Sequence, residues 1–159
     1  MKLLRNFFAE AKGGTLYPSL EMPLVNEDLE TKPLDGRITA FRDALKKAQV
    51  VVVASPEYNG SLSPALKNAI DWGTRGDNLW VGKVVVLLSA SPGALGGVRG
   101  LIHLRTVLSG IKAWVVPEQV MLPHADQAFD KEGKLTNETT RKHIAMALDS
   151  AQKFAGKVL

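Results

Sequence analysis

Two short, uninterrupted apolar runs constrain the fold of this chain more than any other feature of its sequence. The first is Val50-Val51-Val52-Val53-Ala54 and the second is Val84-Val85-Val86-Leu87-Leu88. Runs of this length without polar alternation are typical of strands that are covered on both faces, as in a parallel sheet. Residues 111–116 form a third apolar run, and we expect Pro117 to end that strand.

Helical patterns separate these strands. Apolar residues recur at helical spacing in residues 38–48, 64–72, 98–108 and 144–154. Ser63 and Pro64 suit the N-cap and the first position of the second of these helices. A helix over residues 3–11 and a short strand at residues 15–17 are expected before them. Strands that alternate with helices predict an α/β fold with a central parallel sheet, and 159 residues indicate one domain, 1–159.

Composition excludes several classes of function. The net charge is +4, but the basic residues are scattered, so we expect no nucleic-acid partner. No apolar run approaches the ~20 residues that span a bilayer, which predicts a cytoplasmic protein without a membrane partner. The chain has no cysteine, and its three histidines lack metal-ligand spacing, so we expect no metal site.

Ligands of open α/β sheets bind beyond the carboxyl ends of the strands, where two loops lie here. The first is Ser55-Pro56-Glu57-Tyr58-Asn59-Gly60-Ser61. Pro56 fixes one φ angle and Asn59-Gly60 tolerates positive φ, so the loop turns tightly with its amide groups exposed. Tyr58 adds an aromatic face. These features suit a flat heteroaromatic ligand. The alternative is a plain strand-to-helix turn in which Glu57 is solvated.

The second loop is Ser91-Pro92-Gly93-Ala94-Leu95-Gly96-Gly97. Its glycines remove side chains where another group comes close, either a ligand or a tightly packed helix. It matches neither a dinucleotide fingerprint nor a Walker A loop. Both loops meet at one edge if their strands are neighbours. Neither loop carries a nucleophile with a partnered base, so no catalytic side chain is expected. Chemistry performed by a bound cofactor needs none.

Residues 55–61, together with Leu66-Lys67-Asn68-Ala69-Ile70-Asp71-Trp72, resemble the NAD(P)H-dependent FMN reductases. That family includes quinone, chromate and azo-dye reductases. Residues 91–105, 23–30 and 128–136 resemble further segments of the family, so the similarity covers nearly the whole chain.

The resemblance implies a flavodoxin-like three-layer fold and an FMN cofactor that takes a hydride from NADPH or NADH. The acceptor would be a small molecule such as a quinone, a free flavin, an azo compound or a metal oxyanion. It also implies a homodimer, in which helices beginning near Pro64 and Val98 pack between subunits. Whether dimers pair into a homotetramer stays open. The residues implied to line the flavin ring are Pro56, Glu57, Tyr58, Asn59 and Gly60 on one side and Ser91, Gly93, Gly96 and Gly97 on the other.

Family members begin with a buried strand and a phosphate-binding loop, and a helix like residues 2–11 follows. This sequence starts within that helix, so the first strand and the loop are expected to be missing. Three explanations stay open. The sequence lacks upstream residues, which we favour; Leu16-Tyr17 pairs with the strand at 50–54; or another chain supplies a strand. The phosphate site is therefore in question.

Two other functions are weighed against a reductase. A truncated or degenerate member would keep the fold and bind no flavin. An electron carrier of flavodoxin type is disfavoured, because such carriers are usually acidic and the pI here is about 9.4. Arg99 is interpreted either as a group that holds an anionic cofactor or as half of an intersubunit salt bridge. We expect Trp80 to serve packing, with the edge of the flavin pocket as the alternative.

Overall fold

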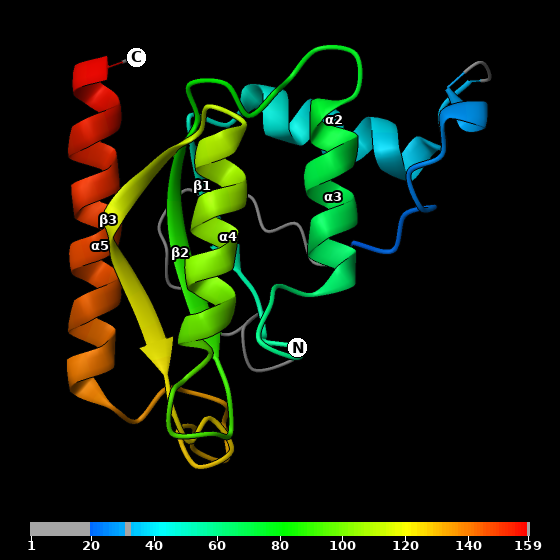
Figure 1. Ribbon diagram of the computed structural model, residues 1–159. Helices are drawn as coiled ribbons and strands as arrows, with labels where there is room; N and C mark the ends of the chain where they lie inside the picture. The colour runs from blue at the N-terminus through cyan, green and yellow to red at the C-terminus, as the bar shows by residue number, and fades with distance from the viewer. Residues whose placement is uncertain (1–19, 31–32, 159) are drawn as a thin grey trace.

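The computed structural model describes residues 20–30 and 33–158 (Figure 1). The helix expected over 3–11 and the strand expected at 15–17 lie outside these residues. The elements in chain order are η1 (Glu27–Leu29), α2 (Gly36–Lys47), β1 (Val50–Ala54), α3 (Pro64–Thr74), β2 (Val84–Ala90), α4 (Val98–Gly110), β3 (Trp114–Leu122) and α5 (Glu138–Val158).

The described strands form a parallel sheet in the order β1-β2-β3. Val50 pairs with Val84, and Val84 pairs with Trp114 on the other side. The central strand β2 is buried along almost its whole length. The structure thus confirms the parallel sheet predicted from the apolar runs, and it confirms that the strands at 50–54 and 84–88 are neighbours.

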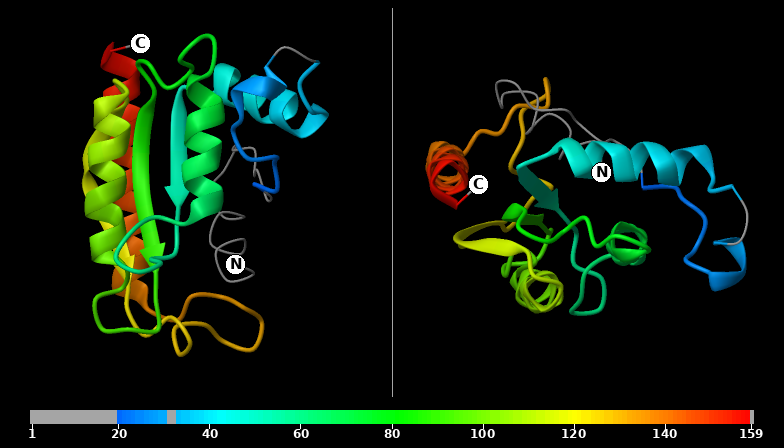
Figure 2. Two further views of the ribbon diagram at one scale, coloured as in Figure 1. Left: turned by 45° about the vertical axis from the view of Figure 1, so that its right-hand side comes forward. Right: turned by 90° about the horizontal axis from the view of Figure 1, so that it is seen from above.

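Helices cover both faces of this sheet, which gives three layers (Figures 1 and 2). Alternate residues of β2 point to opposite faces. Val85 and Leu87 pack in the cluster that contains the buried side chains of α2, α3 and α4. Val84, Val86 and Leu88 pack against α5, which presents Ala147, Ala151 and Ala155 to the sheet. This architecture confirms the flavodoxin-like three-layer arrangement.

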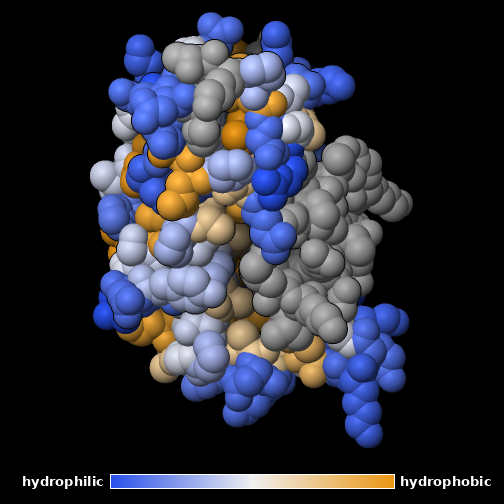
Figure 3. All heavy atoms as spheres, turned by 90° about the vertical axis from the view of Figure 1, so that its right-hand side faces the viewer, coloured by the Kyte–Doolittle hydropathy of each residue, from blue (hydrophilic) through white to orange (hydrophobic). Residues whose placement is uncertain are grey.

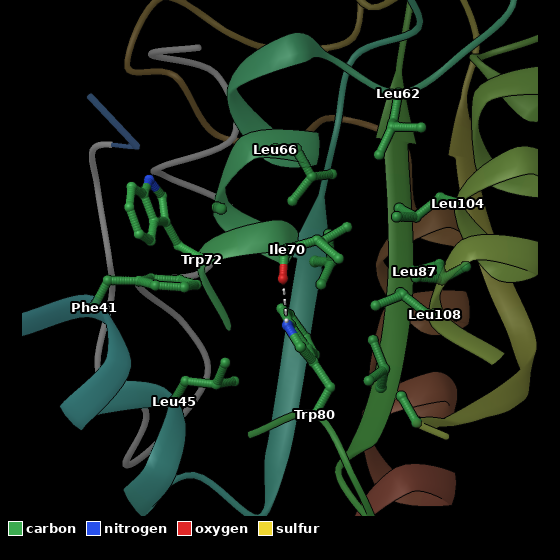
Figure 4. Packing of buried hydrophobic residues seen from close by; sticks show 14 of the residues in the cluster. Phe41, Leu45, Leu62, Leu66, Ile70, Trp72, Trp80, Leu87, Leu104 and Leu108 are labelled. Carbon is green, nitrogen blue, oxygen red and sulfur yellow. Dashed lines mark hydrogen bonds between the residues drawn. The ribbon is translucent and has the colours of Figure 1, made fainter. Parts of the chain in front are cut away.

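Tryptophans fill the α3 side of the core. Trp72 on α3 is fully buried, and Trp80 from the following loop is 2% exposed. The Trp80 indole Nε1 donates to the Ile70 carbonyl at 3.2 Å, as the dashed line in Figure 4 shows. Gly73 makes room for this ring, because a Cβ there would lie 2.3 Å from Trp80 Nε1. The expectation that Trp80 serves packing is therefore confirmed.

The prediction that Pro117 ends the third strand is wrong. Strand β3 begins at Trp114 and runs through Pro117 to Leu122. Val85 pairs with Val115 and Leu87 pairs with Gln119, so β3 has two more residues than β2 between these pairs. This bulge, on the outermost described strand, accommodates a proline because the residues in it need no ladder hydrogen bond.

Arg105 on α4 supports the bulge from the side. Its guanidinium donates to the Val116 carbonyl at 2.9 Å, to the Pro117 carbonyl at 3.3 Å and to Gln119 Oε1 at 3.2 Å. The bulge frees these backbone oxygens from the ladder, and a fork of N–H donors suits several acceptors at once. The bulged geometry of β3 thus depends on a side chain from a different element.

The exposed apolar side chains on the face shown in Figure 3 lie in small areas separated by hydrophilic residues. The exposed large apolar side chains of the protein include Leu24 and Leu34. Isolated exposures of this kind are ordinary on a protein surface. Among the described residues, no helix is both long enough and apolar enough to cross a membrane.

We predict that Arg105→Met lowers the free energy of unfolding by about 1–3 kcal/mol, because partly buried carbonyls of the bulge lose their donors. Urea denaturation followed by circular dichroism measures this. Lys142→Met, at an exposed position on α5, is the control and should stay within about 0.5 kcal/mol of the wild type. Equal stability of the two variants would show that Arg105 does not support the bulge.

Candidate flavin site

The loops after β1 and β2 lie side by side at the carboxyl edge of the sheet, at the lower end of the molecule in Figure 1. The Ser55 amide, at the end of β1, donates to the Leu88 carbonyl of β2 at 3.0 Å. The Ser91 amide, at the end of β2, donates to the Leu122 carbonyl of β3 at 3.1 Å. Loops 55–61 and 91–97 therefore meet at one edge, as the sequence predicts.

Loop 55–61 contains a tight turn closed by two backbone hydrogen bonds. The Tyr58 amide donates to the Ser61 carbonyl at 2.9 Å, and the Ser61 amide donates to the Tyr58 carbonyl at 3.0 Å. Asn59 and Gly60 between them have φ values of 51° and 80°. Asparagine and glycine are the residues that tolerate this region best. The turn leaves the Tyr58 side chain 55% exposed.

Glu57 caps helix α4 from this loop. Its Oε2 accepts hydrogen bonds from the backbone amides of Arg99 at 3.1 Å and Gly100 at 3.2 Å. Its Oε1 accepts from Arg99 Nε at 2.8 Å, within an ion pair. The N-cap residue of α4, Gly97, has no side chain to do this. The first-turn amides therefore receive their acceptor from a residue outside the helix.

The electrostatics of Glu57 follow from these contacts. Its side chain is 10% exposed, and burial alone would raise the pKa of the carboxyl group. The Gly100 amide, the Arg99 side chain and the Arg99 amide more than offset that effect, so the pKa of Glu57 lies below its ordinary value of 4.5. The carboxylate thus stays ionised and bound to α4.

Sequence reasoning missed this role for both partners. Glu57 is neither solvated nor turned toward open space, and Arg99 pairs with Glu57 of the same chain. No local pattern indicates such a pair, because the two residues are 42 positions apart. One indication was present in the sequence: Gly97 precedes the helix, and a glycine N-cap has no side chain that could accept hydrogen bonds from the first helical amides.

The three glycines of loop 91–97 have different surroundings. A Cβ on Gly96 would lie 2.8 Å from the Pro123 nitrogen, and one on Gly97 would lie 1.9 Å from Ser89 Oγ. Both also have positive φ, 57° and 86°. Close packing onto the sheet therefore accounts for these two. A Cβ on Gly93 would meet only Ser91 Oγ, at 3.6 Å, so Gly93 borders open space.

Comparisons with known proteins place this geometry in a family. The family model described as NADPH-dependent FMN reductase matches residues 9–127. The chain belongs to the NADPH-dependent FMN reductase family. It is 36% identical over 137 residues to the NADPH:quinone oxidoreductase of Arabidopsis thaliana. The match covers 84% of this chain and 69% of that relative.

Two further proteins support this assignment. The chain is 35% identical over 139 residues to an NAD(P)H-dependent FMN reductase of Pseudomonas aeruginosa, covering 86% of this chain and 75% of that one. The solved structure of FerB, a flavoenzyme NAD(P)H:(acceptor) oxidoreductase from Paracoccus denitrificans, matches with a TM-score of 0.83 and 28% identity. That match covers 99% of this chain and 89% of FerB. The protein is accordingly an NAD(P)H-dependent oxidoreductase that uses FMN.

The two loops of this FMN reductase fit the ring of the cofactor. Within the part of the chain that the structure describes, the backbone amides of Glu57, Asn59, Gly60, Ala94 and Leu95 donate to no protein group. In strand β2, Ser89 Oγ is also buried without a hydrogen-bond partner. Unpartnered N–H donors beside an exposed aromatic side chain match the ring carbonyls and flat faces of an isoalloxazine.

The described residues fit the flavin phosphate less well. Helix N-termini are ready sites for phosphate, but those of α3, α4 and α5, which begin at this edge, already have side-chain acceptors. Glu57 occupies the start of α4, and Ser63 Oγ accepts from the Leu66 amide at the start of α3. A phosphate would also meet the negative charge of Glu57. Within residues 20–30 and 33–158, the loop groups that suit a flavin ring are therefore not accompanied by an uncapped helix N-terminus that suits its phosphate.

A hollow of about 290 Å³ lies at the end of β3 and the start of α5. Two of its polar lining residues are already bonded within the protein. Asn137 Oδ1 accepts from the Thr140 amide at 2.9 Å, and Thr136 Oγ1 donates to the Ala128 carbonyl at 3.1 Å. Among the described residues, no cluster of three or more histidines and acids could hold a metal ion.

We predict that Glu57→Gln destabilises the reductase at neutral pH, because the charge that the α4 amides and Arg99 bind is lost. The folded-state pKa of Glu57 lies below 4.5, so its contribution is present above that pH and is lost as the pH falls below it. The stability gap between variant and wild type should therefore shrink with acidification.

Denaturant unfolding at several pH values between 7 and 3.5 measures this gap. Glu132→Gln, in the exposed loop before α5, is the control and should show no gap at any of these pH values. A Glu57→Gln gap that stays constant from neutral to acidic pH would contradict the assigned charge interaction.

Proposed function

We propose that this protein reduces quinones with NADPH or NADH through an FMN whose isoalloxazine ring lies between loops 55–61 and 91–97. The observation that supports this proposal best is the set of unpartnered backbone amides in both loops. These loops include the exposed Tyr58 and lie at the carboxyl edge of two neighbouring parallel strands. Similarity to NADPH:quinone oxidoreductases supports a quinone as the acceptor.

The residues of the two loops divide into two roles. Tyr58, Asn59, Gly60 and Gly93 border open space and, with the free amides of Ala94 and Leu95, would contact the ring chiefly through backbone groups. The others hold these in place: Pro56, Glu57, Ser91, Gly96 and Gly97. Glu57 does so by binding α4, while its own amide remains free for the ring. Ser91 does so through its Oγ, which accepts from the Gly93 amide at 3.1 Å.

Bound FMN would supply the redox chemistry, which is hydride transfer from NAD(P)H to the acceptor. The protein contributes position and hydrogen-bond donors. Amide donors at the pyrimidine end of the ring would stabilise negative charge that reduction places there. No protein side chain needs to act as a nucleophile or base in this chemistry. The prediction that neither loop carries a nucleophile with a partnered base is nevertheless wrong, because Ser61 Oγ of loop 55–61 lies 2.8 Å from His103 Nδ1.

We also propose that residues 1–159 form one domain, which works as a cytoplasmic homodimer where NAD(P)H is available. Ile102 on α4 is 59% exposed and Leu95 in the adjoining loop is 60% exposed. Apolar side chains of this size beside a ligand edge favour a subunit contact there. Sedimentation velocity would test the dimer, and a monomer at micromolar concentration would contradict it.

The direct test of the proposed function is a titration of the purified chain with FMN, followed by NADPH consumption with 1,4-benzoquinone. We expect quenching of flavin fluorescence, and NADPH oxidation that depends on both FMN and the quinone. A folded chain that neither quenches flavin fluorescence nor consumes NADPH would support the alternative, a family member that keeps the fold without flavin.

We predict that Tyr58→Ala weakens FMN binding about tenfold, because an aromatic contact worth about 0.5–1.5 kcal/mol beyond its area is lost. Tyr58→Phe should bind FMN nearly as the wild type does. The melting temperature should not change, since the side chain is more than half exposed. Fluorescence titration measures the affinities.

Trp114→Ala is the matched control for Tyr58→Ala. Trp114 is equally exposed, at 55%, but it lies at the amino end of β3, far along the sheet from the loops. Its removal should leave FMN affinity unchanged. Equal losses in the two variants, or no loss in Tyr58→Ala, would place the ring elsewhere.

A further inference from the structure

Loop 55–61 lies directly against the first two turns of α4. A Cβ on Gly100 would lie 3.0 Å from the Ser61 carbonyl oxygen and 3.4 Å from Glu57 Cβ. A side chain at this position would require the loop to move back by a few tenths of an ångström. Arg99, Gly100 and His103 share one face of the helix, because residues three and four apart are neighbours on a helix surface. That face is the platform on which the loop rests.

Two side-chain contacts fasten the loop to this platform, one near each end. Glu57 binds the amides at the start of α4, as described above. At the other end, Ser61 Oγ lies 2.8 Å from His103 Nδ1. Either partner can donate in this hydrogen bond, depending on the imidazole tautomer. The contact is exposed to solvent.

The position of Ser61 controls the turn that precedes it. Its backbone exchanges two hydrogen bonds with Tyr58, and Asn59 and Gly60 lie between them with positive φ. A non-glycine residue in this region carries a conformational cost, so such a turn persists only when its surroundings hold it. The Ser61–His103 hydrogen bond is one of the interactions that hold this turn.

We propose that His103 is a positioning residue for the flavin, which acts through Ser61 to keep the Tyr58–Gly60 turn in its binding conformation. This inference rests on the proposed function, because it takes loop 55–61 as the site of the ring. A preorganised loop binds more tightly, since it loses less freedom when the ligand arrives. His103 therefore contributes to FMN affinity without touching the reacting atoms.

The test is a double-mutant cycle on FMN affinity with Ser61→Ala, His103→Ala and the double variant, followed by fluorescence quenching. We expect each single variant to raise the Kd for FMN about three- to tenfold. The double variant should be no weaker than the weaker single variant, because both remove the same bond. At saturating FMN, kcat should match the wild type.

A conservative variant separates the hydrogen bond from other effects of losing the ring. His103→Asn retains a side-chain amide near the position of Nδ1, so it should recover most of the affinity. His143→Ala, at an exposed position on α5, is the matched control and should not change the Kd. In the flavin-free protein, amide exchange at Tyr58 and Ser61 should be faster in the Ser61→Ala and His103→Ala variants.

Unchanged affinity in both single variants, additive losses in the double variant, or a fall in kcat at saturating FMN would overturn the inference. If the wild-type chain itself binds no FMN, the proposed function fails and the inference fails with it. If the wild type binds FMN and the variants equal it, only the role of His103 is lost. The two failures are therefore distinguishable.

Discussion

The bond between the Glu57 carboxylate and the amino end of α4 is the contact on which the geometry of the site depends. Helix α4 follows Gly97 and has no capping side chain of its own, so its first amides need an acceptor from elsewhere. Glu57 supplies it from the loop after the neighbouring strand. The loops after β1 and β2 are thereby joined through one helix, and a shift in either would break the cap.

Packing at the glycines works together with this cap. Gly96 and Gly97 allow loop 91–97 to pack closely against Leu122 and Ser89. Gly100 allows loop 55–61 to pack closely against α4. In these closely packed loops, the described structure gives no protein acceptor to the amides of Glu57, Asn59, Gly60, Ala94 and Leu95. Hydrogen-bond donors on closely packed loops suit a cofactor that performs the redox chemistry itself. Such a cofactor needs the protein only to hold its ring in place and to provide polar contacts.

Local sequence rules predicted the parts that depend on neighbours in the chain. The valine runs indicated β1 and β2, Ser63 and Pro64 indicated the start of α3, and residues 55–61 indicated the family. The rules failed where a distant residue decides. Pro117 is tolerated inside β3 because Arg105 supports the bulge, and Glu57 finds its partners 42 positions away. Contacts of this kind leave no periodic trace, so only the folded chain reveals them.

Amide chemical shifts in an ¹⁵N NMR titration with FMN would show whether free amides of the two loops hold the flavin ring. We expect the amides of Glu57, Asn59, Gly60, Ala94 and Leu95 to shift most. The amides of residues that line the hollow between β3 and α5, such as Gln127 and Thr140, should stay nearly unchanged. If FMN shifts the amides around the hollow and leaves those of the two loops unaffected, the ring does not lie between the loops.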